Sequence, residues 1–150
     1  MAREVDMSIL DEDDRNAAVI EIQAGSDLSQ KDVMETRQWL LRRDLLPDNV
    51  YLMVVSQDTG FLWNRTAPKD TNFPPDYEFP MQGVVSRYFP SLKSSDERLW
   101  DVVLETVIYQ WMLDLSAELR DANDTPENII APSGFLEALK VGDILTKARV

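Results

Sequence analysis

Two carboxylates and an amide, spaced as if on two neighbouring strands, are the side chains of this sequence best suited to chemistry. Asp6 lies in a short alternating segment, and Glu21 and Gln23 lie one residue apart in an apolar segment that follows a polar turn. If the two segments pair as a hairpin, both carboxylates can converge on one hard cation, with the carbonyl of Ile22 available as a further oxygen ligand. A magnesium or manganese ion at that point could activate a water and neutralise charge on a phosphodiester.

The amino-acid composition excludes most other kinds of site. The chain of 150 residues contains no His and no Cys, which excludes serine–histidine triads, thiolate nucleophiles, zinc–thiolate sites and disulfides. Any remaining chemistry must use carboxylates, Lys, Arg, Tyr, Ser or a metal ion with oxygen ligands. A fraction of 44% hydrophobic residues indicates a globular protein, and the length fits a single domain over residues 1–150.

The charge balance limits the expected partners. Asp and Glu number 27 against 15 Lys and Arg, so the formal net charge is −12. Such a chain repels a phosphate backbone unless its cations gather in one place, so nucleic acid is possible but disfavoured as a partner. No apolar run approaches the ~20 residues of a spanning helix, and residues 1–6 lack an apolar signal-peptide core. We therefore expect a cytoplasmic protein without a membrane partner.

The first part of the chain, residues 1–65, has the pattern of an α/β core. Residues 5–10 and 18–24 predict two strands of a hairpin, joined by the acidic turn at 11–14. An amphipathic helix is expected over residues 29–46, with Ser29 or Asp27 as its cap. The apolar run at 50–56 predicts a buried strand, followed by a returning strand at 61–64, and the strand–helix–strand order favours a right-handed crossover between parallel strands.

The remaining part, residues 66–150, predicts a loop followed by helices in the same domain. A proline-rich loop covers residues 66–80, and a long amphipathic helix runs from a cap at Ser95 or Asp96 to about Asp121. Its apolar stripe, from Trp100 to Trp111 and Leu115, predicts core packing. The other expected elements are short helices at 81–89 and 133–140 and a last edge strand at 143–148. A smaller patch on the long helix, formed by Val102, Tyr109 and Leu113, is either a second buried face or a dimer contact.

Arg37 lies in the middle of the apolar side of the helix expected at 29–46. A guanidinium cannot be buried there without a partner. It could reach Glu21 or Asp6 as a structural partner, or contact a substrate phosphate as a site residue, and both interpretations stay open. The main basic cluster, Lys31, Arg42 and Arg43, is typical of a solvated helix face, with a nucleic-acid-contacting edge as the alternative.

Simpler interpretations of the acidic residues also stay open. Asp6 can be a strand-start or turn residue, and Gln23 can make hydrogen bonds without a catalytic role. Glu21 is harder to explain in this way, because a carboxylate within an apolar strand loses hydration unless something binds it. The acidic run at 11–14 lacks the glycine and terminal glutamate of a calcium loop, so we interpret it as a solvated turn.

The motif and its surroundings resemble the PD-(D/E)XK nuclease superfamily, especially its small bacterial and cyanobacterial members. Val5-Asp6 is followed 15 positions later by Glu21-Ile22-Gln23, then by the helix, the buried strand, the stretch 75–78 and a Trp-rich helix. The resemblance implies a restriction-endonuclease-like mixed sheet (hairpin, helix, strand, strand) flanked by helices, with a helical C-terminal half. It also implies a magnesium- or manganese-dependent nucleic-acid phosphodiesterase in which Asp6 and Glu21 bind the metal, Gln23 occupies the third motif position and Arg37 assists.

Two departures from the family pattern point to an alternative function. The motif lysine is Gln23 here, which can donate a hydrogen bond but brings no charge to the developing phosphorane. Only residues 1–4 precede the strand of Asp6, where the family core has a helix and a strand, so the domain is trimmed or is completed by its C-terminal helix or by a partner. The alternative is a non-catalytic nuclease-like protein that acts as an oligomeric subunit, including a homodimer, or as a protein-interaction module.

Overall fold

A six-stranded mixed sheet forms the centre of the structure, a computed structural model that describes residues 4–24, 28–70, 72–92, 94 and 97–149. The strand order is β5-β4-β3-β2-β1-β6. The strands are β1 (Glu4–Leu10), β2 (Asn16–Ile22), β3 (Tyr51–Val55), β4 (Thr59–Trp63), β5 (Tyr77–Pro80) and β6 (Asp143–Arg149).

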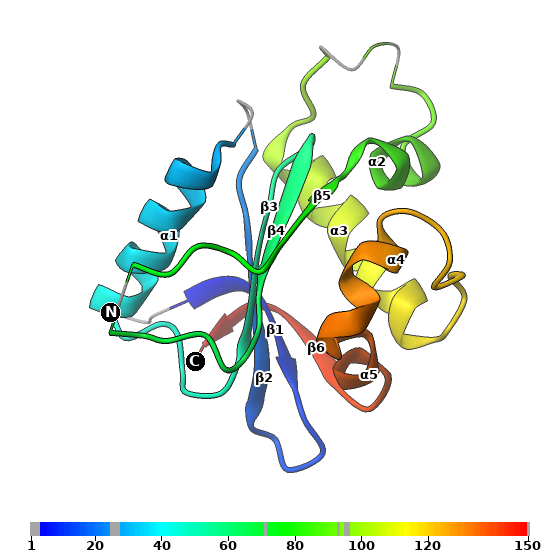
Figure 1. Ribbon diagram of the computed structural model, residues 1–150. Helices are drawn as coiled ribbons and strands as arrows, with labels where there is room; N and C mark the ends of the chain where they lie inside the picture. The colour runs from blue at the N-terminus through cyan, green and yellow to red at the C-terminus, as the bar shows by residue number, and fades with distance from the viewer. Residues whose placement is uncertain (1–3, 25–27, 71, 93, 95–96, 150) are drawn as a thin grey trace.

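Helices cover both faces of this sheet (Figure 1). One face carries α1 (Gln30–Arg42) together with the segment between β4 and β5, and the other carries the remaining helices. These are α2 (Gln82–Tyr88), α3 (Asp101–Ser116), α4 (Glu127–Ile130), the short 3₁₀ helix η1 (Ala131–Ser133) and α5 (Phe135–Lys140). The prediction of an α/β chain with a mixed sheet flanked by helices is therefore confirmed.

The pairing of the first strands follows the predicted order. β1 and β2 form an antiparallel hairpin. β2 pairs parallel with β3, and the helix α1 connects these two strands along the chain. The helix begins at Ser29, whose side chain and that of Asp32 form a capping box, so Ser29 is confirmed as the cap, whereas Asp27 lies outside the described residues. The helix ends at Arg42, earlier than the predicted boundary at residue 46.

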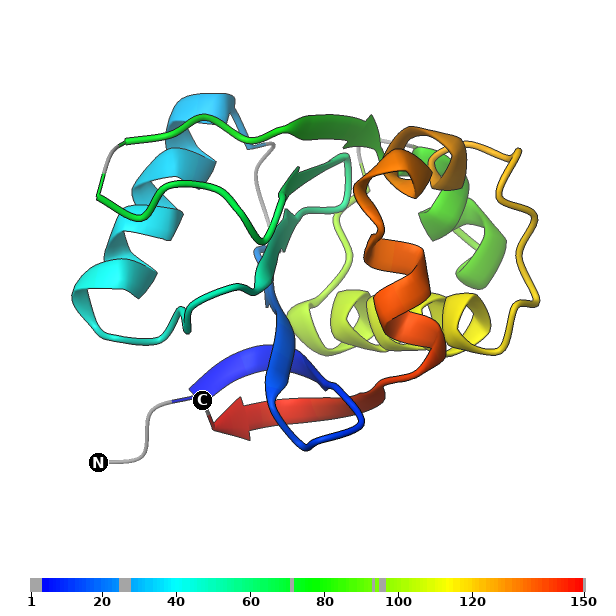
Figure 2. The same cartoon turned by 60° about the horizontal axis from the view of Figure 1, so that its bottom comes forward.

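The outer neighbour of β1 comes from the end of the chain. β6 pairs antiparallel with β1 from Glu4↔Arg149 to Leu10↔Asp143, and both views show the two strands side by side (Figures 1 and 2). The predicted edge strand at 143–148 is thus confirmed. The sheet beyond β1 is extended by this strand and not, as one of the predicted options had it, by the C-terminal helix.

Alternating side chains divide the interior into two apolar layers. Val19 and Leu52 pack with Val33 and Leu40 beneath α1, whereas Ile20 packs on the other face with the helices. Each large apolar side chain buried in this way stabilises the fold by roughly 1.5–3 kcal/mol. Because Glu21 and Gln23 alternate with Ile20 and Ile22, they lie on the α1 face of β2.

The prediction for the long helix was wrong at both ends. α3 begins at Asp101 with Trp100 as an extended N-cap residue, and it ends at Ser116, although we expected a helix from the cap at residues 95–96 to residue 121. Ser95 and Asp96 lie outside the described residues. Trp100 is 83% exposed, so its predicted place in the core stripe was also wrong, because a helical period does not apply to a residue outside the helix. Trp111 is buried as predicted.

Candidate functional site

Asp6 and Glu21 meet where β1 separates from β2. The printed pairs of the hairpin end at Met7↔Ile20, and the next position outward places Asp6 opposite Glu21. At this point the main-chain N–H groups donate to carboxylate oxygens and not to main-chain carbonyls of the neighbouring strand. The Asp6 N–H donates to Glu21 Oε1 at 3.2 Å, and the Ile22 N–H donates to Asp6 Oδ2 at 2.8 Å. The two crossed hydrogen bonds hold both carboxylates at the fork between the strands.

The neighbouring strands explain why the fork forms here. β2 continues in register with β3, where Glu21 lies beside Val54, while β1 continues in register with β6. The two halves of the sheet thus stay paired on their outer sides as they separate from each other. The structure therefore brings together the two acidic residues that the sequence singled out, on the face covered by α1.

The pKa of Glu21 reflects its burial beside a second acid. Burial, followed by the negative charge of Asp6, raises the pKa of Glu21 to about 7. Hydrogen bonding between the two carboxyl side chains acts in the same direction because it needs a proton, and the positive charge of Lys147 acts against it. At neutral pH Glu21 therefore still holds a proton for much of the time, and a cation could take the place of that proton.

The donor set of the fork fits a hard divalent ion. The raised pKa of Glu21 beside a second carboxylate indicates a local shortage of positive charge, and carboxylate oxygens are the ligands that Mg²⁺ prefers. In the part of the chain that the structure describes, no set of three acidic side chains forms a metal-ligating group. A cation at the fork would therefore take two side chains from the protein and complete its shell with water, as Mg²⁺ commonly does.

Gln23, the third predicted site residue, lies at the margin of the fork and is tied to α1. Its Nε2 donates to Thr36 Oγ1 at 2.7 Å, and its main-chain N–H donates to the Val55 carbonyl. Thr36 Oγ1 in turn donates to the carbonyl of Asp32. The amide is held in place by these bonds, but it brings no charge to the carboxylates.

Arg37 lies in a different part of the α1 face. It is 2% exposed, donates to the Pro68 carbonyl and lies over the ring of Trp63 at 5.7 Å. Burial lowers its pKa, and the negative charge of Asp76 opposes that change. Its described contacts thus connect α1 to β4 and to the segment that follows β4, which is what a structural partner does.

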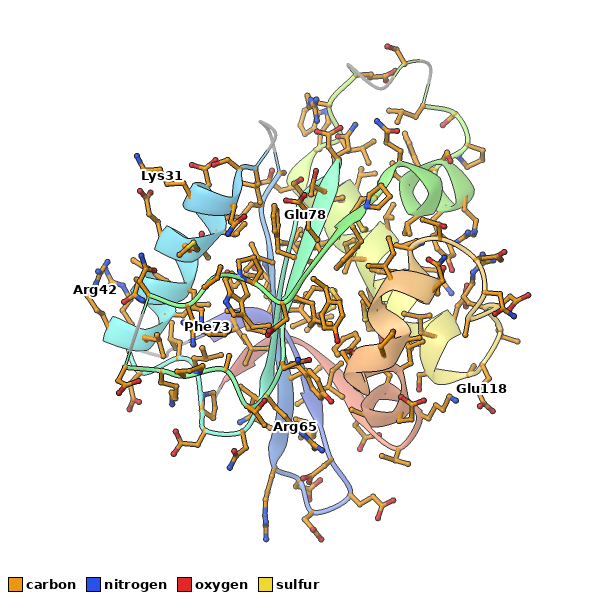
Figure 3. All side chains as sticks on the ribbon, in the orientation of Figure 1. Lys31, Arg42, Arg65, Phe73, Glu78 and Glu118 are labelled. Atoms are coloured by element: carbon orange, nitrogen blue, oxygen red, sulfur yellow. The ribbon has the colours of Figure 1, made fainter. Side chains whose placement is uncertain are left out.

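The predicted basic cluster lies on the solvent side of α1. Lys31, Arg42 and Arg43 are all exposed, and Lys31 and Arg42 point away from the sheet (Figure 3). The guanidinium of Arg43 lies over the ring of Trp39 at 4.6 Å. The helix separates this cluster from the carboxylate pair, which lies between α1 and the sheet.

Sequence reasoning missed two residues near the fork. Ser8 is fully buried two positions from Asp6, and its Oγ has no hydrogen-bond partner among the described residues. Lys147 lies on β6, opposite Asp6 in the strand register. The edge strand itself was predictable from its composition, but the sequence held no signal for the strand with which it pairs.

Comparisons with known proteins add no relative. No family model, no curated protein and no solved structure matches this chain. Among the described residues, no helix is both long enough and apolar enough to cross a membrane.

Proposed function

We propose that this protein is a metal-dependent phosphodiesterase that acts on nucleic acid in the cytoplasm, with Asp6 and Glu21 holding a Mg²⁺ or Mn²⁺ ion. The observation that carries the proposal is the pair of crossed hydrogen bonds that fixes both carboxylates at the strand fork, together with the raised pKa of Glu21. Carboxylates placed on two adjacent strands are the arrangement that the resemblance to PD-(D/E)XK nucleases implies.

The strand arrangement also supports a restriction-endonuclease-like fold. The hairpin, the crossover helix and the parallel strand follow one another as that family requires. β6 lies on the far side of β1, so the sheet extends past the strand of Asp6.

Each part of the proposed site has a distinct role in hydrolysis. The bound ion would supply charge neutralisation and make a water more acidic. Asp6 and Glu21 would hold the ion, and Glu21 would lose its proton when the ion binds. Hydrolysis joins the water oxygen to phosphorus and breaks one phosphorus–oxygen ester bond, while a proton passes to the leaving alcohol. Gln23, fixed by Thr36, could donate a hydrogen bond to a phosphate oxygen only by giving up that contact.

Cleavage assays on single- and double-stranded DNA and RNA test the proposal. We expect cleavage that needs Mg²⁺ or Mn²⁺, stops with a chelator, and falls by at least about a hundredfold in Asp6→Asn and Glu21→Gln. Asp13→Asn, an exposed acid of the turn at 11–14, is the matched control and should retain activity. Equal activity in the two fork variants and the wild type would exclude the fork as the active site.

The alternative, a non-catalytic subunit or interaction module with the same fold, is favoured by Gln23. Its neutral amide is held by α1, and the net charge of −12 opposes contact with phosphates. Gln23→Lys distinguishes the two functions, since it should create activity in an inactive parent if only the charge was lost. Size-exclusion chromatography with light scattering tests the homodimer, which a strict monomer would contradict.

A further inference from the structure

We propose that Lys147, on the edge strand β6, is the cation that contacts the substrate phosphate at the Asp6–Glu21 fork. This inference rests on the proposed function and assigns a residue that the motif does not contain. The register between β1 and β6 places Lys147 beside the fork. β6 pairs with β1 at Val5↔Ala148 and Met7↔Thr146, so Lys147 occupies the position opposite Asp6.

Three neighbouring strands thus place one residue each in a single row. Asp6 lies opposite Glu21 on one side and opposite Lys147 on the other. Directly opposite residues of antiparallel strands have Cβ atoms about 5 Å apart, so the three positions are neighbours across the sheet. The row therefore consists of two acids and one base at the point where the sheet forks.

The backbone at Lys147 departs from strand geometry. Its φ is 52°, in the left-handed region that a non-glycine residue rarely adopts. Such a conformation directs a side chain away from the regular alternation of the strand. The Lys147 Nζ lies 3.4 Å from Glu105 Oε1 on α3, which covers the face of the sheet opposite α1.

The contact with Glu105 leaves Lys147 able to move. The distance is long for a charge-assisted hydrogen bond, and the Lys147 side chain is 64% exposed. Exposed ion pairs of this kind contribute little to stability. The positive charge of Lys147 also acts on Glu21, where it lowers the pKa. A phosphate oxygen arriving at the fork could therefore draw the ammonium away from Glu105.

Because Gln23 is neutral, the third motif position supplies no positive charge, and Lys147 could supply it instead. Gln23 brings no charge to the fork and is held by Thr36. A phosphodiester that approaches two carboxylates needs positive charge beyond that of one divalent ion, because negative charge accumulates in the transition state. Lys147 provides it from a strand that lies far from the motif in the sequence.

Binding of bis(p-nitrophenyl) phosphate in Mg²⁺, followed by calorimetry on the full chain, tests this role. We expect Lys147→Met to weaken binding of the probe by at least about tenfold, and Lys147→Arg to restore most of the loss. Mg²⁺ affinity should stay equal or rise in Lys147→Met, since a like charge is removed from the metal site. Glu105→Gln should strengthen binding of the probe, because it releases the lysine.

A purely structural lysine gives a different pattern. If Lys147 only pairs with Glu105, then Lys147→Met and Glu105→Gln change probe binding in the same direction, which would overturn the inference. Normal Mg²⁺ binding with unchanged probe affinity in Lys147→Met overturns the role of Lys147 and leaves the proposed function standing. Absence of Mg²⁺ binding in the wild type overturns the proposed function, and the role of Lys147 falls with it.

Discussion

Glu21 is a carboxyl group that folding makes harder to ionise. Its pKa rises from 4.5 to about 7 on folding, chiefly because burial removes water from the charged form. Between these two pH values the folded protein holds one proton more than the unfolded chain. The free energy of unfolding therefore falls as the pH rises through this window, and the favourable contribution is complete below about pH 4.5.

The first prediction concerns this pH window in metal-free buffer. We expect the wild type to lose about 3 kcal/mol of stability between pH 4.5 and pH 7 through this group alone. Glu21→Gln should remove that part of the slope and be the more stable protein at pH 8. Chemical denaturation at several pH values measures both, with Glu12→Gln of the exposed turn as the control. Parallel stability curves for the wild type and Glu21→Gln would show that Glu21 titrates normally.

Among the helices, a buried carboxylate connects three elements on the face opposite α1. Glu127 of α4 is fully buried and accepts a hydrogen bond from Trp111 Nε1 of α3 at 3.3 Å. Its Oε1 also lies 3.5 Å from Arg87 of α2 and 3.7 Å from Arg120, which follows α3. Removing one member of such a group leaves the opposite charges without compensation.

The second prediction follows from this contact. Glu127→Gln should lower the free energy of unfolding by about 3 kcal/mol, because two partly buried arginines lose their common partner. Asp124→Asn is the matched control. Asp124 is an exposed partner of Arg120, so its loss should cost less than about 1 kcal/mol. Similar effects of the two substitutions in urea denaturation would contradict this account of α4.

The pairing of β4 with β5 depends on a close approach at Gly60. A Cβ placed there would lie 2.1 Å from Cε2 of the buried Phe79, the residue opposite Gly60 in the register. Gly60→Ala should therefore destabilise the protein by about 1–3 kcal/mol through overpacking. Gly83→Ala, in α2 with 3.8 Å to its nearest neighbour, should be neutral or stabilising by about 0.5–1 kcal/mol. Thermal unfolding of both variants checks the prediction, and equal midpoints would contradict it.

Across the whole molecule, the parts with a local signal were predictable from the sequence. Alternating apolar residues predict the hairpin, an amphipathic pattern predicts α1, and a continuous apolar run predicts the buried strand β3. The approach of Asp6 to Glu21 follows from the hairpin, because its turn length fixes which residues face each other. Their roles in metal binding and catalysis stay predictions.

The rest depends on contacts between distant parts of the chain. A strand at the end of the sequence can pair with either edge of a sheet, so the place of β6 beside β1 was not predictable, and Lys147 was missed with it. The choice of partner for Arg37 depended in the same way on a segment beyond β4. Trp100 shows the limit of periodicity, since an apolar residue at a helical spacing lies outside the helix and in solvent.

The most direct test of the central claim is calorimetric titration of the metal-free protein with Mg²⁺ at pH 6 and pH 8, in buffers of different ionisation enthalpy. We predict one site that binds more tightly at pH 8, with protons released on binding, because the cation replaces the proton held by Glu21. The double variant Asp6→Asn/Glu21→Gln should give no binding heat. Undiminished Mg²⁺ binding by this folded double variant, or no binding by the wild type at pH 8, would contradict the account.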